Sequence, residues 1–190
     1  MSLTVERAKE ISKGHVTEES LVIHSLNVCY AMGAMAKHFG EDVEHWQAVG
    51  YLHDYDYQEF PEEHLQHTEK ELLAQGVSEE DVRAILAHGF EIVNQVEPKT
   101  NMEKSLFTVD ELTGIIQACA RMRPNGILDL EVKSFMKKFK DKKFAAGCSR
   151  DVIREGAERL GWDLDTLLDK TISAMRVDEA AIFEAIEKLN

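Results

Sequence analysis

The sequence predicts an all-α fold, and three observations lead to that prediction. Apolar residues recur at steps of three and four positions through most of the chain, which is the spacing of one face of an α-helix. Capping motifs and glycines stand at the ends of several of these stretches. The alternation of apolar and polar residues that marks a β-strand is scarce. With 190 residues, 44% of them hydrophobic, and no linker or repeat, the chain is expected to form a single domain, residues 1–190.

Three helices are expected in the first part of the chain. Residues 21–35 carry an apolar stripe at helical spacing, and Gly40 is expected to end that helix, as a glycine beyond the last turn commonly does. A second stripe covers residues 43–53. Pro61 is expected to open a third helix and Gly76 to end it, because proline suits the first turn of a helix.

Two capping motifs predict the next helices. Ser78-Glu-Glu-Asp81 precedes the helix expected at residues 82–88, and Thr100-Asn-Met-Glu103 precedes the one expected through residues 106–116. Further helical patterns follow Pro124 at about residues 129–139, 149–160, 163–175 and 178–189.

Charge and composition exclude several classes of function. The formal net charge of −13 argues against an extended nucleic-acid partner, since a phosphate backbone requires excess lysine and arginine. A small phosphorylated substrate stays compatible, because metal ions or a local basic patch reverse the field. No apolar run approaches the roughly 18 residues of a membrane span, and the N-terminus lacks the apolar core of a secretory signal. Three widely spaced cysteines favour reduced thiols and a cytoplasmic location.

The adjacent pair His53-Asp54, at the end of an apolar stretch, is the strongest functional signal. Imidazole nitrogen and carboxylate oxygen together suit a borderline-to-hard divalent metal. Taken singly, a histidine on an apolar stripe is more often a core residue with one hydrogen bond, and a histidine at a helix end can cap it. A carboxylate near a core costs several kcal/mol unless it is paired or binds a metal. One metal centre would account for all six such groups: His24, His53, Asp54, His64, His88 and Asp110.

The order of these residues resembles a known signature. The series His24, His53-Asp54, Asp110 resembles the H…HD…D signature of the HD superfamily of metal-dependent phosphohydrolases. The similarity runs from about Leu21 to Thr113. It implies an HD-domain helical bundle whose metal-binding core spans about residues 21–120, with extra C-terminal helices at about 125–190.

The resemblance also implies a set of ligands. His24, His53, Asp54 and Asp110 would hold one divalent ion. His64 and His88 resemble the two extra histidines of the dinuclear branch and would hold a second ion, with Asp54 as a bridging carboxylate. The ions could be Fe, Mn, Zn, Ni, Co or Mg, and one or two of them could bind.

Two features near the second ion depart from a simple match. His67 competes with His64 for the ligand role, because residues three apart on one helix are near neighbours; the spacing to the small-residue position that follows favours His64. Thr68-Glu69 stands where many relatives have Gly-Ala, and it is expected to bring bulk and charge close to the site.

The chemistry implied is hydrolysis of a phosphomonoester or phosphoanhydride, such as a nucleotide or dinucleotide, by metal-activated water. Asp54 would orient that water. Asp56 and Glu111 are the other candidate catalytic groups, as proton carriers or as partners of the ligands. A solvated or capping carboxylate is an equally good interpretation of both.

A lysine-rich stretch offers candidates for binding the rest of a phosphorylated substrate. Lys137, Lys142, Lys143 and, from the preceding helix, Arg121 could gather phosphate over the metal centre. The alternative is a solvated helix face that balances the acidic surface.

Two other classes of function stay open. Di-iron oxygenases of the HD fold resemble this chain in their four histidines and two aspartates, and metal identity and oxygen dependence would separate them from hydrolases. A non-catalytic ligand-binding domain is the third class. Apolar residues near the C-terminus could close the domain or pair two chains as a homodimer: Ile182, Phe183, Ile186 and Leu189.

Overall fold

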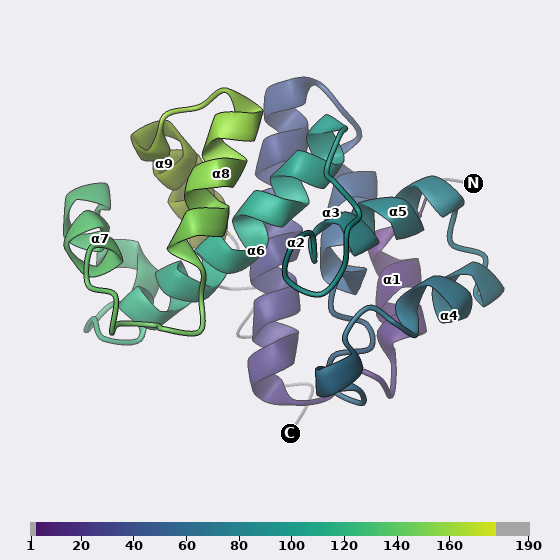
Figure 1. The fold of residues 1–190 in the computed structure, drawn as a ribbon. Helices are drawn as coiled ribbons and strands as arrows, with labels where there is room; N and C mark the ends of the chain where they lie inside the picture. Colours follow the sequence, from purple (N-terminus) through teal and green to yellow (C-terminus); the bar gives the residue numbers. More distant parts are fainter. Residues whose placement is uncertain (1–2, 178–190) are drawn as a thin grey trace.

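Two long helices, α2 (Glu19–Phe39) and α6 (Asn101–Ala120), form the centre of the fold. The computed structural model describes residues 3–177, and within them the regular structure is helical, with no β-strand. Figure 1 shows α2 standing between two groups of helices while α6 crosses it. The predicted all-α fold is confirmed. No helix in this part of the chain is long and apolar enough to cross a bilayer.

The first group packs on one side of α2 and consists of α1 (Val5–Ser12), α3 (Val43–Leu52), α4 (Thr68–Ala74) and α5 (Glu79–Ala87). The second group lies on the other side (Figure 1) and consists of a short 3-10 turn, η2 (Gly126–Asp129), followed by α7 (Val132–Phe139), α8 (Arg150–Leu160) and α9 (Leu164–Val177). The helices predicted at 129–139, 149–160 and 163–175 therefore form, while the one predicted at 178–189, with its candidate dimer residues, lies outside the described residues.

The sequence signals at several helix ends act as expected. Gly40 ends α2 in the left-handed conformation, at φ 72°, which a residue with a side chain adopts only at a cost. The Ser78 hydroxyl accepts the Asp81 N–H at the start of α5. Thr100 and Glu103 form a complete capping box on α6. Helix α1 has no counterpart among the predicted helices, because its two turns offer too few repeats to establish a periodicity.

The predicted helix from Pro61 to Gly76 is wrong in its first half. Pro61–Glu63 forms only a short 3-10 turn, η1, and α4 does not begin until Thr68. Between them the chain turns sharply, with Leu65 in the left-handed region at φ 66°. The buried carboxylate of Asp56 accepts the N–H of Leu65 (3.0 Å) and of Thr68 (3.2 Å), and these bonds replace helical ones.

Two glycines allow close approach to the long helices α2 and α6, which carry the candidate ligands His24 and Asp110. A Cβ at Gly50 in α3 would lie 2.9 Å from Met32 Cγ and 3.1 Å from the Val28 carbonyl oxygen of α2. A Cβ at Gly156 in α8 would lie 2.0 Å from Thr108 Oγ1 of α6. Helix α2 is thus packed directly on α3, and α8 on α6, at the level of the candidate site.

Arg150 holds the loop between α7 and α8 in place. Its buried guanidinium donates to the carbonyl oxygens of Ala145 (2.7 Å), Cys148 (2.9 Å) and Asp141 (3.2 Å), and also to that of Phe144. One cation therefore satisfies several carbonyl groups of a loop that has no regular structure of its own. We call residues 140–149 the Arg150 loop.

We expect Arg150→Leu to lower the free energy of unfolding by about 2–4 kcal/mol, because it leaves a set of partly buried carbonyl groups without a donor. Chemical denaturation followed by circular dichroism measures this. Arg154→Leu, one turn along α8 at a half-exposed position, is the matched control and should cost less than about 1 kcal/mol. Equal losses in the two variants would contradict a special role for Arg150.

Candidate metal centre

His53 and Asp54 follow directly on the last turn of α3, and two other helices bring side chains to them. His24 Nε2, from α2, lies 2.9 Å from Asp110 Oδ1, from α6, and 3.1 Å from His53 Nε2. The Asp54 atom nearest to both histidines is Oδ2, at 3.5 Å from His24 Nε2 and 3.3 Å from His53 Nε2. The four residues of the HD signature thus converge in space, although up to 86 positions separate them.

His64 and His88 form a second group beside the first. His64 follows η1, and His88 caps the C-terminal end of α5. Their Nε2 atoms are 3.2 Å apart and lie 3.4 and 3.7 Å from Asp54 Oδ1. We call His24, His53 and Asp110 the first donor group, and His64 and His88 the second donor group.

Asp54 stands between the two donor groups, with one carboxylate oxygen toward each. Ligand atoms of His24, His53 and Asp54 lie within 4.8 Å of one another, and so do those of Asp54, His64 and His88. Four imidazole nitrogens and two carboxylates suit divalent ions of borderline to hard character. The residues present fit two such ions that share Asp54.

Hydrogen bonds on the far side of the rings determine which nitrogen faces the centre. Nδ1–H of His53 donates to the Gly50 carbonyl oxygen at 2.8 Å, and Nδ1–H of His88 donates to that of Ile85 at 2.6 Å. Nδ1–H of His64 donates to Asp56 Oδ1 at 2.9 Å. Each of these rings therefore turns Nε2 toward the shared centre.

The electrostatics of the centre favour bound cations. Burial alone would raise the pKa of Asp54 and Asp110, but the neighbouring imidazoles more than offset this and hold the pKa of both carboxyls below its ordinary value. Burial opposes a charge on His53, yet the two carboxylates raise its pKa well above the usual value. Burial lowers the pKa of His88 to about 4, so this ring is neutral at pH 7 and its Nε2 lone pair is free to bind a metal ion. Two ionised carboxylates in a buried site require positive charge close by.

Asp56 lies behind His64, away from the centre. Its side chain is 1% exposed and accepts the backbone N–H groups of Leu65, His67 and Thr68 as well as Nδ1–H of His64. The structure thus places Asp56 where it orients a candidate ligand, since it lies beyond the reach of a substrate bound in front of Nε2.

The sequence predicts that His64 and His67 lie on one helix. In the structure His64 follows η1 and His67 precedes α4, so the two rings point in different directions. The His67 ring stacks on Phe60 and its Nε2 lies 2.8 Å from Glu63 Oε2, a side chain that is more than half exposed. His67 therefore turns toward solvent.

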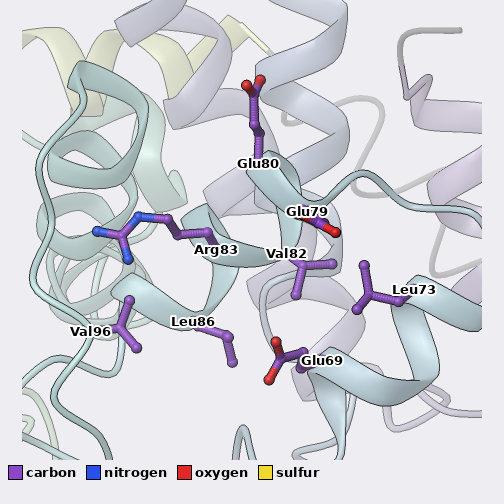
Figure 2. Close-up of a pocket in the computed structure, with 8 residues that line it drawn as sticks. All are labelled: Glu69, Leu73, Glu79, Glu80, Val82, Arg83, Leu86 and Val96. Carbon is purple, nitrogen blue, oxygen red and sulfur yellow. The ribbon is translucent and has the colours of Figure 1, made fainter.

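The Thr68-Glu69 pair also leaves the centre clear, contrary to expectation. Thr68 is buried and its N–H donates a hydrogen bond to the Asp56 carboxylate, while Glu69 is exposed. Figure 2 shows Glu69 in a separate hollow between α4 and α5, beside Leu73 and Leu86. Because α4 begins one residue before Glu69, its first turn directs that carboxylate outward.

A cavity of about 420 Å³ opens on the metal centre. Its floor includes His24, Asp54, His64, His88 and Asp110. Its walls add residues from α2, the turns after α3, η1, the turn after α5, α6 and the Arg150 loop: Leu21, Tyr57, Pro61, Gly89, Ile92, Val93, Glu111, Gly114, Gly147 and Cys148.

Glu111 faces this cavity from α6. Its Oε2 accepts the Ser149 N–H at 2.8 Å, which ties the Arg150 loop to the helix that carries Asp110. Burial, together with the neighbouring Asp110 carboxylate, raises the pKa of Glu111 to about 7. Of the three candidate catalytic carboxylates, Asp54 and Glu111 line the cavity and Asp56 does not.

The four basic residues expected to gather phosphate do not line this cavity. Arg121 is exposed at the C-terminal end of α6, three turns beyond Asp110, and Lys137 lines a different hollow beside Cys119. Lys142 and Lys143 are exposed in the Arg150 loop, whose later residues form the wall instead. That wall, at Gly147 and Cys148, was missed because an irregular loop leaves no periodic signal in the sequence.

Fold and site together define a helical domain in which an open cavity lies over two groups of side chains that could hold metal ions. The family model of the HD domain matches residues 21–118, just over half of the chain, and the chain belongs to this family. HD domains bind divalent metals and are mostly metal-dependent phosphohydrolases. No curated protein and no solved structure matches the chain.

We expect Asp56→Asn to weaken metal binding at the second donor group by about 10–100-fold, because the amide nitrogen cannot accept the N–H bonds that fix this turn. Metal titration that resolves two binding steps measures the effect. The affinity for the ion at the first donor group, which includes His24, should stay unchanged. Glu63→Gln, which alters the partner of His67, is the matched control. If Asp56→Asn binds both ions with wild-type affinity, Asp56 does not position His64 for metal binding.

Proposed function

We propose that this protein is a phosphohydrolase that uses two divalent ions to cleave a small phosphorylated molecule by attack of water. The observation that carries the proposal is the position of Asp54, whose two oxygens face separate donor groups at distances of 3.3 to 3.7 Å. A carboxylate in this position can bridge two ions, and an open cavity lies directly in front of it.

The first donor group and Asp54 would hold one ion, and the second donor group and Asp54 the other. When bound, such ions lower the pKa of a water ligand and neutralise charge on phosphoryl oxygens. Asp54 fixes the positions of the two donor groups relative to each other, because one of its oxygens faces each group. His53, His64 and His88 are orientated by their Nδ1 hydrogen bonds, so little reorganisation is needed when substrate arrives.

We assign proton transfer to Glu111. It is a carboxyl group that borders the cavity outside the two donor groups, and its Oε2 is held by the Ser149 N–H. Oε1 can then exchange a proton with the departing oxygen of the substrate. Asp56 acts as a positioning residue through His64.

We expect Asp54→Asn to lose both ions, His64→Ala to lose one, and both to reduce turnover by at least about 100-fold. Elemental analysis of protein purified without chelators measures metal content, and circular dichroism checks that helical content is kept. His67→Ala is the matched control, because it removes a nearby imidazole that points to solvent and should leave metal and turnover unchanged. Full metal content in Asp54→Asn would refute the bridging role.

Four imidazoles and two carboxylates would equally suit a di-iron oxygenase, so oxygen dependence is the second test. We expect release of inorganic phosphate from phosphorylated metabolites at the same rate in air and under anaerobic conditions. Oxygen consumption coupled to substrate loss, with no activity in its absence, would identify the oxygenase instead.

A further inference from the structure

The mouth of the metal cavity carries exposed apolar side chains. Ile92 is 53% exposed, Val93 46% and Tyr57 40%, and all three line the cavity together with Leu21 and Pro61. We call these five residues the apolar rim. Exposed apolar groups that gather at a cavity mark a binding surface more strongly than the same groups scattered singly.

Hydrogen bonds fix the backbone of the part of the rim that follows α5. Ile92 and Val93 belong to a turn in which the Gly89 carbonyl oxygen accepts the N–H of both residues, at 3.1 and 2.9 Å. Asn94 closes the turn by donating from Nδ2 to the Leu86 carbonyl oxygen at 2.7 Å and by accepting the Val96 N–H at 2.8 Å. The two side chains therefore face solvent from a fixed backbone, which limits the entropy lost when they contact a ligand.

The cavity offers little to a second phosphate. Among the described residues, no lysine or arginine lines it. Apart from Asp54 and the donor groups, its polar side chains are Glu111, Tyr57 and Cys148. Another phosphate beyond the metal centre would lie near the Glu111 carboxyl without a protein cation to neutralise it, and like charges in a partly buried site repel.

We propose that the substrate is a phosphomonoester with an apolar leaving group, aromatic or branched aliphatic, and a single phosphoryl group. The phosphoryl group would lie on the metal centre and the leaving group against the apolar rim. This inference rests on the proposed phosphohydrolase function and specifies its substrate class.

Binding of two non-hydrolysable probes to the metal-loaded protein tests the proposal. Benzylphosphonate and methylphosphonate present the same phosphonate next to a carbon and differ by a phenyl ring. We expect benzylphosphonate to bind at least about tenfold more tightly by calorimetry, the factor that follows from removing roughly 60 Å² of apolar surface from water. The α,β-methylene analogue of a nucleoside diphosphate should bind more weakly than benzylphosphonate.

A rim variant separates contact with the leaving group from general effects. Ile92→Lys should bring the affinities for the two phosphonates to within about twofold of each other, while Ile92→Leu keeps the difference. Leu128→Lys, at a 58% exposed position on η2 outside the cavity, is the matched control and should behave as wild type.

The outcomes distinguish the two levels of the proposal. If neither phosphonate binds and the diphosphate analogue does not bind either, the phosphohydrolase function itself fails. Equal binding of both by the wild type, or an unchanged difference in Ile92→Lys, overturns the apolar leaving group while the phosphohydrolase stands. Tighter binding of the diphosphate analogue than of benzylphosphonate overturns it as well.

Discussion

The carboxylate of Asp54, placed between two groups of histidines, is the constraint on which the arrangement of the helices depends. One oxygen faces His24 of α2 and His53 at the end of α3, and the other faces the side chains after η1 and α5. An ionised carboxylate at such a depth is costly unless opposite charge or hydrogen-bond donors surround it. The close contact of α2 with α3 at Gly50 brings His24 and His53 together.

Sequence periodicity predicted most of the helices, and the resemblance to the HD signature identified the residues that converge. His24 and Asp110 lie on long amphipathic helices, so their orientation follows from regular geometry. The turn at Leu65 could not be predicted, because the buried side chain of Asp56 overrides the helical preference of the residues that follow Pro61. His64 reaches the centre as a consequence of that turn, and His67 does not.

The walls of the cavity were harder to predict than its floor. The lysine-rich stretch suggested a phosphate-binding wall, but the backbone does not bring Lys137, Lys142 or Lys143 to the cavity. The loop after α7 instead brings Gly147 and Cys148 to the cavity, and its path depends on one buried guanidinium that binds carbonyl groups. Such a network is formed between main-chain atoms and one side chain, so residue types alone do not reveal it.

The bond from Ser149 N–H to Glu111 links the region matched by the family model, which ends at residue 118, to the helices that follow it. Helix α8 also covers α6 at Thr108, two residues from Asp110. The Arg150 loop and α8 are therefore an integral part of the enclosure, and the HD region excised by itself would expose Thr108 and Glu111 of α6 to bulk water.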